Sequence, residues 1–215
     1  MNLPISSILK RRSELETAQL EDDVVNVLAS ITDKMTLHGG TVIWRCYGGK
    51  RFSTDIDAYI WDRGFKEKFI RVAEKIGIEV SKFREKSVTF INVRKNNTEI
   101  KVEPRNVEKE AILVPYERVD GSKMNMLVLS PEDLVLEKIE AYSDRRAYKD
   151  LYDITILLNS VKEPGKIKGA ILNFGKDVPA PNEDTQSYSE FRATIYTGVV
   201  PSYTKMSDFI KRWAA

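Results

Sequence analysis

The hydrophobic pattern of the chain changes at Ser130, and this change limits the possible folds more than any other feature of the sequence. Before Ser130, segments with helical spacing of apolar residues are mixed with segments of strand-like alternation. After it, only helical spacing is found, and Ser130 itself, followed by a proline and two acids, is a strong helix-start signal. The pattern predicts an α+β fold, with an α/β domain over residues 1–129 and a helical domain over residues 130–215.

Apolar spacing and turn residues place the individual elements. The expected elements are helices over residues 13–35, 65–76, 131–142, 148–158 and 167–174, strands over residues 53–61, 88–93 and 98–103, two strands flanking Asp120-Gly121, and one or two short helices near the C-terminus. Pro104 is expected to end the third strand, and Glu163-Pro164-Gly165 to interrupt the helices. The first helix is expected to carry its acids on a polar face opposite the apolar one, namely Glu14, Glu16, Glu21, Asp22 and Asp23.

Two residue counts exclude several kinds of site. The chain has one cysteine, Cys46, and one histidine, His38. An internal disulfide, a four-cysteine zinc site and a zinc site with two histidines are therefore impossible within it, and any metal is expected to have oxygen ligands. A net charge of +2 argues against coating nucleic acid by bulk charge. No apolar stretch approaches a membrane span, and a cytoplasmic location is expected.

The strand over residues 53–61 carries the strongest candidate for a reactive site. Alternate side chains of a strand share a face, so Ser53, Asp55 and Asp57 are expected on one side and Ile56 on the other. Two neighbouring carboxylates repel each other unless a cation lies between them, and oxygen ligands of this kind suit Mg²⁺ or Mn²⁺. Glu103, at the end of a later strand, could complete a cluster of three carboxylates, with Glu99 as the alternative.

A pair of aspartates on a half-exposed strand is, taken alone, more often a solvated surface than a site. The residues before the pair favour a site, because Gly39-Gly40 supplies free backbone N–H groups and Lys50 and Arg51 supply positive charge. Donors, cations and carboxylate-held metal are what a triphosphate requires. The other unusual residues, His38 and Trp44 among them, are expected mainly to pack, although Trp44 or Tyr47 could stack a base.

With these motifs in place, the sequence resembles a known family. The run LHGGTVIWRCYGGKRFSTDIDAYI, with SPEDLVLEKIEAYSDRRAYKDLYDI downstream, is similar to AbiEii/AbiGii-type toxin nucleotidyltransferases, members of the DNA polymerase β-like superfamily. The resemblance covers residues 37–154 and includes a glycine pair, R-x-S-x-D-x-D, a helical lysine and an acidic motif in that order. It implies a mixed sheet with flanking helices, followed by a helical domain.

The resemblance also assigns roles to individual residues. Gly39 and Gly40 would begin the nucleotide-binding turn, and Asp55 and Asp57 would hold the metal. Lys138, three residues before Ala141, would contact the triphosphate, while Lys50, Arg51 and Ser53 would lie at the nucleotide. Asp150 would take part in catalysis, with Asp153 one helical turn further on. Lys149 stands where this branch usually has arginine.

The implied activity is Mg²⁺- or Mn²⁺-dependent transfer of a nucleoside monophosphate from an NTP to an acceptor. The resemblance suggests a toxin of a toxin–antitoxin pair, with tRNA or another RNA as acceptor and a cognate antitoxin as partner. Arg145, Arg146 and Lys149 are where phosphate contacts to an RNA are expected. Two alternatives stay open at this point: a catalytically inactive relative that acts as a binding partner, and an RNA-binding adaptor whose affinity ignores Mg²⁺ and nucleotide.

Overall fold

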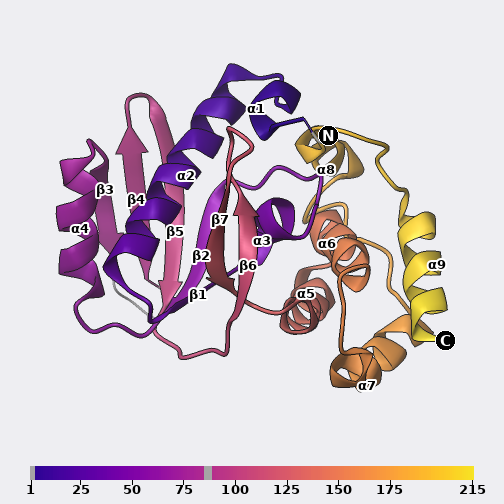
Figure 1. The fold of residues 1–215 in the computed structure, drawn as a ribbon. Coiled ribbons are helices and arrows are strands. Elements are labelled where there is room, and N and C mark those ends of the chain that lie inside the picture. The colour runs from indigo at the N-terminus through magenta and orange to yellow at the C-terminus, as the bar shows by residue number, and fades with distance from the viewer. Residues whose placement is uncertain (1–2, 85–88) are drawn as a thin grey trace. The chain divides into compact units, whose positions relative to one another are not determined.

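The computed structural model describes residues 3–84 and 89–215, which form two compact units (Figure 1). Unit 1 consists of residues up to Cys46 together with Phe52–Leu129, and unit 2 of Tyr47–Arg51 together with Ser130–Ala215. Unit 2 is therefore not one continuous stretch of chain. Whether the two units are separate domains divided at residue 129 stays a prediction.

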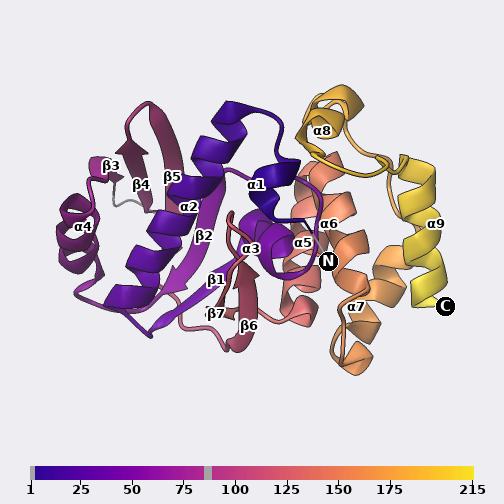
Figure 2. The ribbon, with the colours of Figure 1, turned by 45° about the horizontal axis from the view of Figure 1, so that its top comes forward.

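Unit 1 is built on one mixed seven-stranded sheet in the order β3-β4-β5-β2-β1-β7-β6. Its strands are β1 (Met35–His38), β2 (Asp55–Ile60), β3 (Glu79–Arg84), β4 (Phe90–Lys95), β5 (Thr98–Arg105), β6 (Ile112–Glu117) and β7 (Lys123–Val128). Its helices are α1 (Ile5–Ile8), α2 (Arg12–Ile31), α3 (Gly39–Cys46) and α4 (Phe65–Lys75). Strand β2 is parallel to β5 and antiparallel to β1, so it lies inside the sheet. Helices α2 and α3 pack against the sheet (Figures 1 and 2).

Local turn chemistry correctly predicts both hairpins. In the β4–β5 turn, Lys95 faces Thr98 in register, and Asn96 takes a φ of 54°, which asparagine tolerates better than most residues. In the β6–β7 turn, Gly121 has a φ of 84° and donates its N–H to the Arg118 carbonyl. These segments form as expected because the residues that determine them are adjacent in sequence.

Several expected elements differ in the structure. The first helix ends at Ile31, and Met35 belongs to strand β1, whose four residues are all buried and so show no alternation. Strand β3 was not expected. Strand β5 continues through Pro104, which is buried opposite Ala58, and helix α7 (Pro164–Lys176) begins at the proline expected to interrupt it, because proline suits the first turn of a helix. The expected strand start at Val88 lies outside the described residues.

Unit 2 contains the helices after Ser130. They are α5 (Pro131–Arg145), α6 (Tyr148–Leu158), α7, α8 (Tyr188–Thr194) and α9 (Tyr203–Ala214). The Ser130 side chain accepts a hydrogen bond from the Asp133 N–H, as its N-cap pattern predicts. None of the described helices combines the length and the apolar character that a membrane span requires.

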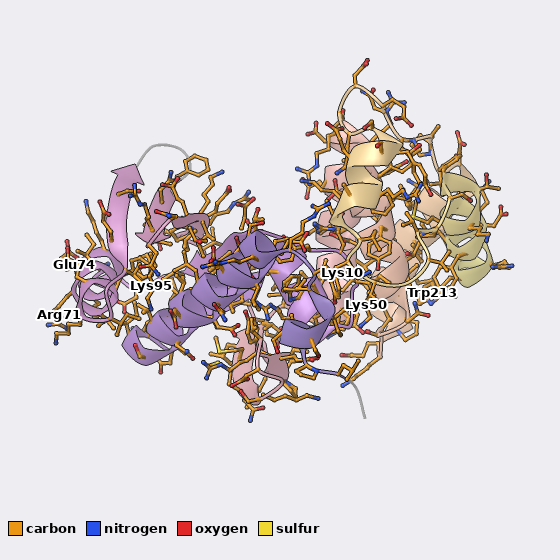
Figure 3. All side chains as sticks on the ribbon, turned by 90° about the horizontal axis from the view of Figure 1, so that it is seen from above. Lys10, Lys50, Arg71, Glu74, Lys95 and Trp213 are labelled. Atoms are coloured by element: carbon orange, nitrogen blue, oxygen red, sulfur yellow. The ribbon has the colours of Figure 1, made fainter. Side chains whose placement is uncertain are left out.

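The segment Tyr47–Arg51 is fixed within unit 2 by hydrogen bonds. The Lys50 N–H donates to the Tyr152 hydroxyl at 2.9 Å, and the Tyr196 hydroxyl donates to the Gly49 carbonyl at 3.1 Å. Arg51 forms an isolated antiparallel bridge with Ile195. Lys50 and Trp213 are two residues of this unit labelled in Figure 3. The segment that leads to β2 thus takes its partners from a part of the chain a hundred residues or more further on.

Candidate functional site

Strand β2 presents its two aspartates on one face, as the alternation predicts. Ile56 and Ala58 are 2% and 0% exposed and lie in the core, whereas Asp55 is exposed and Asp57 half-buried. Ser53 precedes the strand and is also half-buried. Asp55 and Asp57 are therefore placed to share a cation on the side of the strand opposite the core.

The glycine turn lies directly against the second aspartate. His38 at the end of β1 is in register with Asp57, and the chain then turns into α3 at Gly39, which has a φ of +76°. A Cβ atom on Gly39 would lie 2.0 Å from Oδ2 of Asp57. The Thr41 hydroxyl donates to the Asp55 carbonyl at 2.6 Å and ties the first turn of α3 to β2. The start of α3, whose first N–H groups have no partner within the helix, thus adjoins the acidic face.

Strand β5 brings a third carboxylate and a lysine to the same face. In the parallel register, Asp55 faces Lys101 and Asp57 faces Glu103. Lys101 forms an ion pair with Glu103, and its Nζ lies 4.2 Å from the centre of the Phe90 ring. The hydrogen bond to Glu103 and the charges of Glu103, Asp55 and Asp57 raise the pKa of Lys101, against the effect of burial.

The register distinguishes the two candidates for a third carboxylate. Glu103 faces Asp57, whereas Glu99 faces Arg94 on β4 and accepts a hydrogen bond from the Asn92 side chain at 3.0 Å. The placement favours Glu103 over Glu99. Within residues 3–84 and 89–215, no three histidine, cysteine or acidic side chains form a ready-made metal-binding group, and Glu103 is engaged by Lys101.

Unit 2 brings five of the residues singled out in the sequence into one network of charges. Lys138 on α5 lies between two carboxylates of α6, with Nζ 2.9 Å from Asp153 and 3.4 Å from Asp150. Arg51 donates two hydrogen bonds to Asp153, at 2.8 and 3.1 Å, and Arg145 donates two to Asp150, at 2.7 and 2.8 Å. Three cations therefore share two carboxylates, and the network has a net positive charge.

Because the carboxylates of this network are buried, each charge strongly affects the pKa values of its neighbours. Asp150 and Asp153 are 0% and 1% exposed. Burial alone would raise the pKa of Asp153, but the charges of Arg51 and Lys138 hold it below its ordinary value. Burial, together with the charges of Arg145 and Arg51, lowers the pKa of nearby Lys149. Three cations and two carboxylates leave the network with one positive charge in excess.

Lys138 is 9% exposed and paired with two carboxylates. Its expected contact with a triphosphate stays a prediction. Asp150 is likewise enclosed by Arg145 and Lys138. Arg145, whose contact with Asp150 closes the network, was expected only as a contact to RNA.

A second buried cluster in unit 1 contradicts the expected polar face of the first helix. Glu21 and Asp22 on α2 are buried, and both lie within ion-pair distance of the Arg45 guanidinium of α3, at 3.0 and 3.4 Å. Asp22 also accepts hydrogen bonds from the Val119 N–H and the Tyr116 hydroxyl. Burial and the charge of Asp22 raise the pKa of Glu21 to about 7. The helical pattern failed here because Arg45 compensates the acids from another element.

The remaining unusual side chains of unit 1 pack in the structure. The His38 ring stacks on Tyr59, with centroids 4.1 Å apart, and Trp44 is buried against Phe52 and the Arg45 guanidinium. Burial raises the pKa of the Cys46 thiol to about 12, which keeps it protonated and unreactive.

The fold is shared with solved structures, one of which is described as a putative nucleotidyltransferase from H. pylori and superposes with a TM-score of 0.63 over 95% of this chain and 94% of that chain, at 18% identity. The crystal structure of JHP933 from Helicobacter pylori superposes with a TM-score of 0.64 over 95% of this chain and 91% of that chain, at 18% identity. The solution structure of the antibiotic-resistance factor ANT(2'')-Ia superposes with a TM-score of 0.50 over 75% of this chain and 92% of that chain, at 12% identity. No curated protein sequence matches the chain.

The match to a family model, in contrast, gives the class of the protein, a nucleotidyltransferase. Residues 24–195, well over half of the chain, match the family model described as the nucleotidyl transferase AbiEii toxin of type IV toxin–antitoxin systems. The protein belongs to this AbiEii family, as the resemblance in the sequence predicts, and the family supports a transferase.

Proposed function

We propose that the protein transfers a nucleoside monophosphate from an NTP to an acceptor hydroxyl with Mg²⁺ or Mn²⁺ bound at the acidic face of β2. The observation that carries this proposal is the arrangement of Asp55 and Asp57 on one face, with Gly39 and the start of α3 directly against Asp57. Carboxylates for a hard cation and amides for phosphate oxygens thereby adjoin each other.

The donor set fits a divalent metal. Asp55 and Asp57 would hold it, and Glu103, in register with Asp57, would join them. When bound, the metal would neutralise phosphate charge and favour the deprotonated acceptor hydroxyl. Gly39 leaves room for the Asp57 carboxylate to stay on this face, where a side chain would displace it.

The cations of unit 2 are the proposed contacts to the phosphates. Lys138 and Arg51 are held by Asp153, and Lys138 also by Asp150, so their positions are fixed before substrate binds. Lys50 adjoins Arg51 in the same anchored segment. The full burial of Asp150 and its two hydrogen bonds from Arg145 support a positioning role for this residue, as an alternative to direct participation in catalysis.

The proposed acceptor is RNA, with tRNA first among the candidates, and a cognate antitoxin is the proposed partner. Family membership in a toxin–antitoxin system supports both. Arg146 and Lys149, close to the network of Asp150, are the proposed phosphate contacts for the RNA backbone. The mixed charge of the chain as a whole suggests that such contacts are local.

Incubation with each labelled NTP, Mg²⁺ and total RNA tests the proposal directly. Wild-type protein is expected to transfer label to RNA, and Asp57→Asn to reduce transfer at least a hundredfold, because one metal ligand loses its charge. Asp62→Asn is the matched control: Asp62 follows the same strand but is engaged with Lys68, at 2.7 Å, and transfer should be unchanged.

Full transfer by Asp57→Asn would contradict the metal assignment. RNA binding that depends on salt but ignores Mg²⁺ and nucleotide, with no transfer by the wild type, would instead support the adaptor alternative.

A further inference from the structure

Lys101 is a cation built into the acidic face. It lies on β5 opposite Asp55, two residues before Glu103, so that it points to the same side of the sheet as all three carboxylates. Its ammonium group pairs with Glu103, and its side chain is 39% exposed. None of the motifs in the sequence assigns it a role.

Two contacts hold the ammonium group on this face. Glu103 attracts it electrostatically, and the Phe90 ring, at 4.2 Å, provides a cation–π contact from the neighbouring strand β4. The backbone of β5 is fixed between β2 and β4, so the lysine cannot leave by movement of a loop. Only rotation of its side chain can move its charge away.

A lysine ammonium and a divalent cation compete for the same oxygens. While Oε1 of Glu103 is paired with Lys101, that oxygen is not available to a metal, and the lysine charge also repels a cation approaching Asp55 and Asp57.

We propose that Lys101 is an internal competitor of the divalent metal: it occupies Glu103 and weakens metal binding at Asp55 and Asp57 until its ammonium group turns away. This inference rests on the proposed function, because it concerns the same metal site. It follows that the free protein binds metal weakly and that the metal is held well only when nucleotide phosphates supply further oxygens. Lys101 thereby links metal loading to the presence of nucleotide.

Binding of Mn²⁺ to the full-length protein without nucleotide, measured by electron paramagnetic resonance of the free ion, tests the proposal without an activity assay. Lys101→Met is expected to lower the Kd for Mn²⁺ about tenfold, because it removes the competing charge while a methionine can still pack on Phe90. Lys123→Met, an exposed lysine of β7 in the same sheet, is the matched control and should leave the Kd unchanged.

A double-mutant cycle with Glu103→Gln shows whether the released carboxylate is the cause. In the wild-type background, Glu103→Gln should change the Kd by less than twofold, because Glu103 is already occupied. In the Lys101→Met background, it should cancel most of the tenfold gain. Thermal unfolding without metal checks that each variant is folded.

The outcomes separate this inference from the proposed function. Mn²⁺ binding that Asp57→Asn abolishes and Lys101→Met leaves unchanged would overturn the role of Lys101 but keep the metal site. An equal gain from Lys101→Met and Lys123→Met would overturn it as well, since general charge would then explain the effect. No binding to Lys101→Met at millimolar Mn²⁺ would overturn the inference, whereas the metal site itself is overturned only if Asp57→Asn keeps full Mg²⁺-dependent transfer.

Discussion

At the scale of single residues, Gly39 shows how a missing side chain shapes the candidate site. Its φ of +76° is open to glycine, and a Cβ atom there would lie 2.7 Å from Cγ and 2.9 Å from Cβ of Asp57. Rotation of the carboxylate cannot remove the second clash, because the Cβ atom of Asp57 is fixed by the backbone of β2. The close approach of turn and strand therefore requires glycine.

Gly39→Ala is expected to lower the free energy of unfolding by about 2 to 4 kcal/mol, from backbone strain together with the clash. Gly77→Ala separates the two effects: Gly77 also has a positive φ, +75°, but a Cβ atom there meets nothing within 4 Å. It should cost only about 1 kcal/mol. Urea unfolding of both variants measures the difference, and equal losses would contradict the role given to Asp57.

At the scale of elements, the sequence correctly predicts helix starts and turns that depend on adjacent residues. It fails for elements and side chains whose environment depends on residues far along the chain. The start of α5 at Ser130 and the Asn96-Asn97 turn follow from adjacent residues. By contrast, β1 is buried over all four of its residues, and nothing near Met35 marks the change from helix to strand. The acids Glu21 and Asp22 are similarly misread as solvated, because Arg45 is on another helix.

In the candidate site, too, features that depend on nearby residues are predicted and features that depend on distant residues are not. The shared face of Asp55 and Asp57 is predicted from alternation within one strand. The alternation of β5 likewise places Lys101 and Glu103 on one face, where their opposite charges pair. The contact of Arg51 with Asp153 joins residues 102 positions apart, and no local pattern indicates it.

The packing of α2 on α3 through Glu21 and Arg45 predicts an unusual dependence of stability on pH. The pKa of Glu21 rises from 4.5 to about 7 on folding, chiefly by burial. Between these values the folded protein holds a proton that the unfolded chain releases, so stability falls as pH rises. Compared with Glu21→Gln, which imitates the protonated acid, the wild type should lose up to about 3 kcal/mol between pH 5 and pH 8.

Thermal unfolding across this pH range measures that difference. Glu16→Gln on the same helix is the control, because the Glu16 side chain is 39% exposed and its ion pair with Arg12 lies at the surface. The stability of the Glu16→Gln variant should change with pH in the same way as that of the wild type. If the stability of Glu21→Gln also changed with pH as that of the wild type does, the elevated pKa of Glu21 would be ruled out.

At the scale of the whole molecule, the two compact units do not coincide with a single cut in the sequence. A boundary at residue 129 follows from the change of periodicity, yet Tyr47–Arg51 belongs to unit 2. A five-residue segment rich in glycine has no periodicity by which its partner could be identified. Its assignment depends on Tyr152, Asp153 and Ile195, all far along the chain.

A fragment of residues 130–215 is therefore expected to be unstable. Without Arg51, the buried Asp153 carboxylate keeps only Lys138, and loss of one partner of a buried pair costs about 3 to 5 kcal/mol. Attaching residues 47–51 through a flexible Gly/Ser linker should restore cooperative unfolding of the fragment. Circular dichroism during heating measures this unfolding. The same fusion with Arg51→Met should not restore it. A fragment that melts like its fusion would show that the segment is dispensable.

The hydrogen bond from Thr41 to the Asp55 carbonyl limits the donors that the first turn of α3 can offer to an anion. A hydroxyl carries a single proton, and this one points at the backbone of β2. Any phosphate that reached the turn would meet the lone pairs of Thr41, which repel it, so this turn itself could contribute only its main-chain amides to binding. The residue at position 41 is therefore expected to be one that can hydrogen-bond the backbone of β2. A change to valine would disturb the positions of the aspartates more than it would disturb anion binding.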